Sequence, residues 1–356
     1  MEPVTHFLTG TCLGRSGFNR KTAYATLAMV LAAEAPDVDI LWGFRGPVAE
    51  LQHHRGITHT LIFAPVLALG VTAFLWLLDR LRRTPPPIPV RWLWVWLCAL
   101  IADLSHLPLD FSNNYGLRPF LPFSYQWHAW SIVYIFDPWI FSALLLALVI
   151  PALLGLVDRE IGIRKQTLRG RGWAIAALVF VLAWWGLRSY EHNRAIDLVE
   201  NGEYTREPLL RVAAEPRMMN PFNWRVLMET PGTFQTAEVD TLTGQVTTND
   251  YSDVIYKPKA TPALAAAERS YLGQVYMDWA KWPLVEDRGP VEAPGGFVPD
   301  ANWHTVEFQD LRFGYTPDAG DRTDAPSNPP LSGWVYVGPG GEIEGMFMAS
   351  HEQAQR

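Results

Sequence analysis

Residues 98–110 read CALIADLSHLPLD and end a run, beginning at Trp92, that is otherwise typical of a membrane helix. Asp103, His106 and Asp110 interrupt this apolar run at spacings of i, i+3 and i+7. An α-helix turns by about 100° per residue, so the three side chains fall within about 60° of one another on one face. A single polar stripe on a membrane helix is therefore expected.

Polar stripes of this kind are expensive in a bilayer. A charged residue near the bilayer centre costs about 2.5–3.5 kcal/mol on insertion scales. Two carboxylates and an imidazole on one face are thus expected to bind something, most economically a metal ion or a proton. The alternative is that they only pair with one another or with a neighbouring helix.

The chain divides into two parts of different composition. Hydrophobic residues make up 49% of the 356 residues, and the apolar runs lie within residues 1–190. The remainder is more polar, with frequent Gly and Pro. We therefore expect an α-helical polytopic membrane domain over residues 1–190 and a soluble, strand-rich α+β domain over residues 191–356.

The apolar runs predict about five membrane helices after a short N-terminal half-helix within residues 1–18. The five segments are Thr22–Ile40, Leu61–Leu78, Trp92–Asp110, Ser131–Leu156 and Trp173–Leu187. In the second part, alternating patterns predict strands within residues 220–230, 233–248, 303–315 and 332–349. Ala260–Trp282 is expected to form one amphipathic helix that Pro283 ends.

Further His and Asp residues occur near the ends of these helices. Pro36 is expected to break a helix, leaving Asp37 and Asp39 on a turn where both can approach one ion. A solvated acidic turn is the alternative. In HHRGITHT (residues 53–60), His54 and His59 are potential metal ligands, although periodicity does not decide between His53 and His54.

Basic connectors predict the orientation of the helices. Arg residues gather at 80–91 and at 159–171, whereas the loop 111–130 carries only Arg118. The positive-inside rule places both connectors in the cytoplasm and the C-terminal domain outside. The candidate residues then all lie near the outer ends of their helices: His6, Asp37, Asp39, His54, His59, Asp103, His106, Asp110 and Asp137.

Other functional classes receive no support from composition. The net charge of -7 and the lack of a basic stripe argue against nucleic-acid binding. Cys12 and Cys98 are far apart and form neither a disulfide framework nor a CxxC clip.

Five motifs in order carry a family resemblance: TH at 5–6, PDVD at 36–39, HRGITH at 54–59, DLSHLPLD at 103–110 and YGLRPFLPFS at 115–124. Together they resemble the bacterial inner-membrane metal-dependent hydrolases of the YdjM type. The resemblance covers roughly the first 140 residues, with NPFNW at 220–224 similar to a feature of longer members. It implies an inner-membrane hydrolase whose metal ligands come from His6, Asp37, Asp39, His54, His59, Asp103, His106 and Asp110.

Reasoning from the residues alone leads to the same function. Mixed imidazole and carboxylate ligands suit zinc, with manganese or iron as alternatives, and the set is large enough for one or two ions. Such an ion lowers the pKa of a bound water toward about 7. We expect Asp110 or Asp137 to act as general base and Arg55 to contact an anionic substrate.

A site at the outer membrane–water boundary favours an ester or phosphoester of a lipid or other amphiphile. Two other classes stay open. An ion-coupled transporter also uses intramembrane Asp and His residues, but no inverted repeat or polar path to the cytoplasmic ends is visible. A non-catalytic scaffold with a structural metal is compatible with the same ligands.

Overall fold

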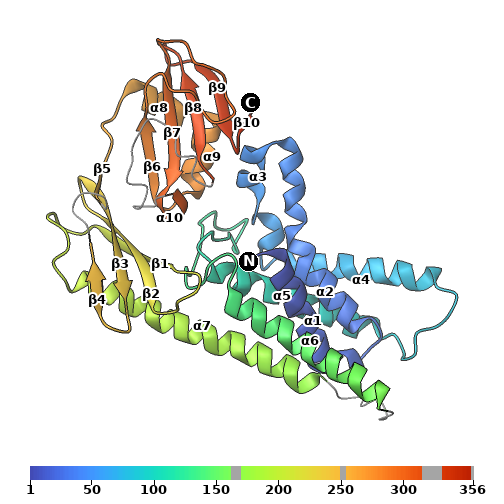
Figure 1. Ribbon diagram of the computed structural model, residues 1–356. Helices are drawn as coiled ribbons and strands as arrows, with labels where there is room; N and C mark the ends of the chain where they lie inside the picture. The colour runs from blue at the N-terminus through green and yellow to red at the C-terminus, as the bar shows by residue number, and fades with distance from the viewer. Residues whose placement is uncertain (162–169, 249–253, 315–330, 354–356) are drawn as a thin grey trace. The chain divides into compact units, whose positions relative to one another are not determined.

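The computed structural model describes residues 1–161, 170–248, 254–314 and 331–353 (Figure 1). The chain forms two compact units. The helical unit comprises Met1–Asp39, Arg55–Asn193 and Pro216–Asn223, and the sheet unit comprises Ile40–His54, Arg194–Glu215 and Trp224–Arg356. The order agrees with a helical N-terminal half followed by a C-terminal region of antiparallel sheets.

The N-terminal half is built from α-helices and 3₁₀ helices, of which η2 (Ala35–Arg45) is 11 residues long. Its elements are α1 (Pro3–Arg15), η1 (Phe18–Arg20), α2 (Ala25–Glu34), η2 (Ala35–Arg45), α3 (Pro47–His53), η3 (Ile57–His59), α4 (Ala64–Leu81), α5 (Trp92–Ser112), α6 (Pro138–Glu160) and α7 (Arg171–Glu200).

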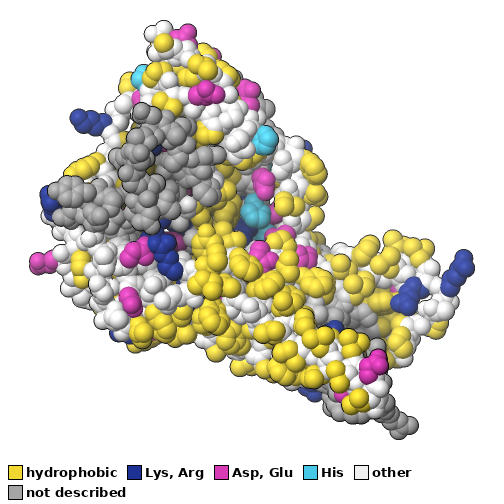
Figure 2. All heavy atoms as spheres, viewed as in Figure 1, with side chains coloured by type: hydrophobic (Ala, Val, Ile, Leu, Met, Phe, Trp, Pro, Cys, Tyr) yellow, Lys and Arg dark blue, Asp and Glu magenta, His cyan; other side chains and the backbone are white. Residues whose placement is uncertain are grey.

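Within the described residues, four helices are long and apolar enough to cross a membrane: α4, α5, α6 and α7. Figure 2 shows hydrophobic side chains gathered over much of the helical half of the chain. The expected span at Thr22–Ile40 is wrong. There the 10-residue α2 ends at Glu34 and gives way to η2, so the helix is shorter than the roughly 20 residues that a bilayer requires.

Small residues bring the helices of this unit together. A Cβ added to Gly10 of α1 would lie 2.6 Å from the Met29 carbonyl oxygen of α2, and one added to Gly14 would lie 2.8 Å from the Thr26 Cα. Gly at positions i and i+4 lets two membrane helices approach closely. Buried alanines continue the contact between α2 and α5, including Ala28, Ala32, Ala99 and Ala102.

The sheet unit holds two five-stranded sheets. The first has the order β1-β2-β3-β4 with β5 paired to β3, and the second has the order β10-β9-β8-β7-β6. Strand bounds are Arg211–Pro216, Asn223–Glu229, Thr233–Asp240, Gln245–Thr247, Val254–Tyr256, Pro283–Asp287, His304–Asp310, Gly333–Val337, Ile343–Met348 and His351–Glu352 for β1 to β10, with α10 at Leu311–Gly314. The four expected strand regions each contain at least one of these strands.

One expectation for this unit is wrong. Ala260–Trp282 forms two helices, α8 (Pro262–Glu268) and α9 (Tyr271–Trp279), instead of one. The Ser270 hydroxyl accepts a hydrogen bond from the Gly273 backbone N–H at 3.0 Å and so caps a new helix. The apolar pattern continues across this break, which is why periodicity alone joins the two helices.

Candidate metal centre

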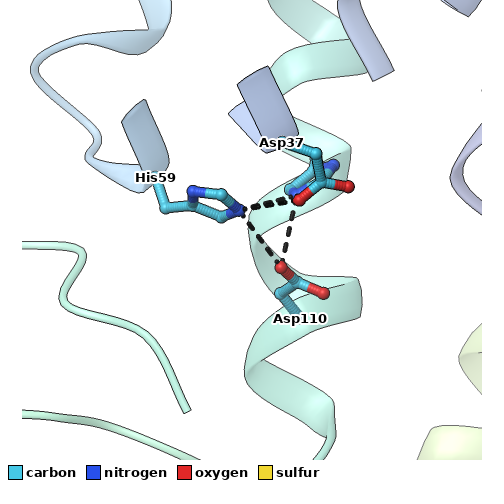
Figure 3. A group of neighbouring side chains, drawn as sticks. Asp37, His59 and Asp110 are labelled. Atoms are coloured by element: carbon cyan, nitrogen blue, oxygen red, sulfur yellow. Dashed lines mark hydrogen bonds and ion pairs between the residues drawn. The ribbon is translucent and has the colours of Figure 1, made fainter. Parts of the chain in front are cut away.

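Four side chains from three separate segments converge in the helical unit (Figure 3). η2 supplies Asp37, η3 supplies His59, and α5 supplies His106 and Asp110 one turn apart. One ligand atom from each lies within 4.8 Å of all the others. These atoms are the Nε2 atoms of the histidines and one carboxylate oxygen from each aspartate.

The distances within this four-residue group suit a small cation. His59 Nε2 lies 3.3 Å from both Asp37 Oδ1 and Asp110 Oδ2. His106 Nε2 lies 3.6 Å from Asp37 Oδ1 and 3.2 Å from Asp110 Oδ2. A tetrahedral ion with bonds of about 2.0–2.2 Å separates its ligand atoms by roughly 3.3–3.6 Å. The four atoms are therefore spaced as ligands of one ion.

In each histidine ring, Nδ1 points away from the group, and the partner of Nδ1 determines which ring nitrogen carries the proton. His106 Nδ1 lies 2.7 Å from the Ala33 carbonyl oxygen, which only accepts, so Nδ1 carries the proton. His59 Nδ1 lies 3.2 Å from Asp39 Oδ2 and therefore donates in the same way. In neutral rings both Nε2 atoms then present lone pairs, and they lie 3.0 Å apart.

Two facing lone pairs beside two carboxylates repel one another unless a cation or a proton lies between them. A neutral imidazole whose other nitrogen donates to a carbonyl or carboxylate is the usual arrangement around a protein-bound metal. The residues present thus fit a divalent ion. Mixed nitrogen and oxygen donors suit zinc, manganese or iron.

Burial isolates the group from water on all but one side. His59, His106 and Asp110 are fully buried, whereas 21% of the Asp37 side chain is exposed. Asp37 therefore marks the accessible side of the centre.

The second oxygen of Asp110 faces away from the group. Oδ1 lies 3.3 Å from His6 Nε2 and 3.0 Å from an Arg55 guanidinium nitrogen, and it also contacts the Met1 amino group. The His6 ring stacks on His106 with centroids 3.8 Å apart. His6 therefore lies directly against the group without contributing to the four grouped ligand atoms.

Arg55 is buried and held by several partners. Its Nη1 donates to Asn113 Oδ1 at 3.0 Å and to the Gly116 carbonyl oxygen at 3.3 Å, and its backbone N–H donates to Asp39 Oδ2 at 2.8 Å. The guanidinium lies 4.9 Å from the Tyr115 ring centroid. These contacts and the Asp110 ion pair make Arg55 a residue that orients carboxylates.

The remaining sequence candidates lie outside the four-residue group. Asp39 contacts His59 Nδ1, on the side of the ring that points away from the group. The Thr58 hydroxyl also donates to Asp39 at 3.0 Å. His54 follows α3 in the sheet unit. Asp103 is fully buried on α5, and neither of its oxygens has a hydrogen-bond partner among the described residues.

Asp137 serves as a helix cap. Its Oδ1 accepts hydrogen bonds from the backbone N–H groups of Trp139 and Ile140 at 3.0 Å each, and its Oδ2 accepts from the Trp184 indole at 3.2 Å. These contacts account for both oxygens at the start of α6. Asp137 is not one of the grouped residues.

Sequence reasoning did not single out Glu34. This residue ends α2 directly after Ala33, whose carbonyl accepts from His106. Burial, and next the negative charge of Asp37, raise the pKa of the Glu34 carboxyl to about 7. In the sequence, its one distinguishing feature is its position three residues before Asp37, the first Asp of the PDVD turn.

Comparisons with known proteins cover the same part of the chain. A family model described as "YdjM inner membrane protein" matches residues 1–195, which include all the grouped residues. The uncharacterized protein YfhP of Bacillus subtilis (strain 168) is 30% identical over 158 residues, which are 42% of this chain and 46% of YfhP. The alignment thus spans about half the length of that relative. No solved structure is significantly similar to the chain.

Proposed function

This chain belongs to the YdjM inner membrane protein family, and from that premise we propose that it is a membrane-bound, metal-dependent hydrolase. The observation that carries the proposal is the convergence of two imidazole Nε2 atoms and two carboxylate oxygens, all within 4.8 Å of one another, with the two nitrogens 3.0 Å apart and each nitrogen 3.2–3.6 Å from both oxygens. Four helices of the described residues are long and apolar enough to span a bilayer, and one of them, α5, supplies two of the four grouped residues.

The four grouped residues are the proposed ligands of one divalent ion, with zinc as the first choice. When bound, such an ion supplies Lewis acidity and an activated water. Asp39 and Ala33 hold the two imidazoles in the tautomer whose Nε2 lone pair faces the group. Arg55 fixes Asp110 Oδ1, so that Oδ2 is directed at the ion.

We assign Glu34 the role of general base, because it directly follows Ala33, whose carbonyl accepts from His106, and precedes Asp37 by three residues. Burial also raises the pKa of its carboxyl to about 7. A base is most effective when its pKa lies near the working pH. Asp110 and Asp137, the bases expected from the sequence, have other partners. Asp110 points at the proposed ion, and Asp137 caps α6.

The proposed substrate is a membrane amphiphile with an ester or phosphoester near its headgroup. The Arg-rich connectors support an orientation in which the outer ends of the helices carry the centre and the C-terminal domain is extracytoplasmic. A site at that boundary meets lipids and acylated molecules directly.

A structural metal in a non-catalytic membrane scaffold is the second candidate. It is favoured by the complete burial of three of the four grouped residues, because a structural ion is enclosed by protein ligands. The exposed part of Asp37 favours the hydrolase, since a catalytic ion needs access for water and substrate.

Turnover by the purified protein tests the proposal. The full chain in detergent, loaded with zinc, manganese or iron, is incubated with a panel of lipid esters and phosphoesters. A hydrolase cleaves at least one class, and His106→Ala abolishes that cleavage. Metal-loaded protein that binds its ion but leaves the whole panel intact supports the scaffold.

A further inference from the structure

We propose that an apolar rim beside the metal centre lies in the lipid bilayer and receives the acyl chain of the substrate. The rim consists of Ile57, Leu61, Ile62, Phe120 and Phe123. This proposal rests on the proposed function for its substrate, whereas the insertion of the rim into lipid stands on the fold alone.

The rim is a continuous surface because two distant segments pair through their backbones. The Arg118 N–H donates to the Arg55 carbonyl oxygen at 3.4 Å, and the Leu61 N–H donates to the Pro119 carbonyl oxygen at 3.1 Å. Residues 55–61 therefore run beside residues 118–119. Both segments belong to the helical unit.

All five rim side chains are exposed although they are hydrophobic. Phe123 is 83% exposed, and the other four are each about half exposed, between 48% and 59%. A large apolar side chain that is open to water forfeits the favourable free energy of burial. The rim thus needs an apolar neighbour.

Continuity with a candidate span identifies that neighbour as lipid. Leu61 and Ile62 lead directly into α4, where Val66 and Leu69 are also exposed. No charged residue occurs between His59 and Asp79 or between Arg118 and His128. An uncharged surface that continues a membrane-spanning helix matches hydrocarbon chains better than the charged surface of a soluble partner.

The rim also connects the bilayer to the centre. Ile57 and His59 share the 3₁₀ turn η3, so an exposed apolar side chain and a proposed metal ligand are two residues apart. A lipid whose chain lies along the rim would bring its headgroup region to the depth of His59. The geometry therefore points to a substrate with a long acyl chain and a scissile bond close to the headgroup.

Spin labelling tests the insertion of the rim without any need for activity. A nitroxide is attached to Phe123→Cys in the full chain, reconstituted in vesicles of phosphatidylethanolamine and phosphatidylglycerol. Leu69→Cys on α4 is the lipid-exposed reference and Val298→Cys in the sheet unit is the water-exposed reference. Unmutated protein measures the background from the buried Cys12 and Cys98.

The expected result is that the label at residue 123 collides with oxygen more than with a water-soluble nickel chelate, as the label at residue 69 does. A label at residue 123 that favours the nickel chelate, as at residue 298, overturns the proposal even if the protein is a hydrolase. Conversely, if the label lies in lipid but the protein hydrolyses nothing, the insertion of the rim is supported and only the proposed hydrolysis is rejected.

A kinetic comparison tests the acyl-chain role. The double variant Phe120→Ser/Phe123→Ser should raise KM for a long-chain substrate in vesicles by about tenfold or more, because it removes two apolar contacts. Hydrolysis of a soluble short-chain analogue should be unchanged, and Val298→Ser should change neither. Equal losses on both substrates, or no change on either, contradict acyl-chain binding at the rim.

Discussion

At the scale of single residues, Arg55 shows how much of the four-residue group depends on a side chain outside it. Its guanidinium holds Asp110 Oδ1 at 3.0 Å, and its backbone N–H holds Asp39 at 2.8 Å. Asp39 in turn orients His59. One buried arginine therefore positions two of the proposed ligands.

We expect Arg55→Ala to weaken metal binding by roughly 10–100-fold, as loss of supporting contacts around a metal site usually does. Arg55→Lys keeps the charge but loses the forked geometry that reaches Asp110, Asn113 and Gly116 together, so recovery should be partial. Titration with a competing chelator measures both. Unchanged affinity with a raised KM would instead make Arg55 a substrate-binding residue.

Replacement of Glu34 separates binding from chemistry. Glu34→Gln should leave metal content near the wild-type value and lower the rate by roughly 10²–10⁴, the usual contribution of general acid–base catalysis. The matched control is Glu268→Gln, on α8 of the sheet unit. If Glu34→Gln turns over at the wild-type rate, another group accepts the proton.

The helical repeat explains which site residues a sequence can predict. His106 and Asp110 share one face of α5 because they are four residues apart, and the structure brings both into the group. Asp37 and His59 lie on 3₁₀ turns whose course depends on tertiary contacts, so only their clustering in the sequence pointed to them. Asp137 directly before Pro138 is a helix-start signal, which accounts for the cap, whereas the location of His54 in the sheet unit had no signal in the sequence.

At the scale of elements, the close approach of α1 and α2 positions His6 and the end of α2. The N-terminal half and its long helices could be predicted from hydropathy, since lipid demands long apolar runs. Pro36 did signal the end of α2, but the apolar sequence continues past it, so hydropathy alone extended the expected span to Ile40. A hydropathy profile does not distinguish residues that are buried in lipid from residues that are buried in protein.

Gly10→Val should disrupt this packing. The new Cβ would lie 2.6 Å from the Met29 carbonyl oxygen, and overpacking of this kind costs about 1–3 kcal/mol. Gly70→Val on α4 is the control, because a Cβ there meets nothing within 4 Å. Thermal unfolding in detergent should show a lower midpoint for Gly10→Val alone. Equal midpoints for the two variants would contradict the tight contact between α1 and α2.

At the scale of the whole molecule, the proposed location of the centre at the outer membrane boundary depends on one orientation of the chain. If the Arg-rich connectors are cytoplasmic, reporter fusions after Arg83 and Gly170 should read as cytoplasmic, and those after Gly116 and Gly202 as external. The measurement is the activity of paired reporters that work on only one side of the membrane. An external signal at Arg83 would invert the orientation and move the centre to the cytoplasmic boundary.

The metal content of the purified protein shows most directly whether the four grouped side chains hold an ion. Elemental analysis after growth with zinc, manganese and iron should find about one bound divalent ion per chain, because the grouped atoms suit one tetrahedral site. His59→Ala/His106→Ala should lose that ion, whereas His304→Ala, in the sheet unit, should keep it. Wild-type protein without a bound ion, or a double variant that retains a full equivalent, would contradict the account.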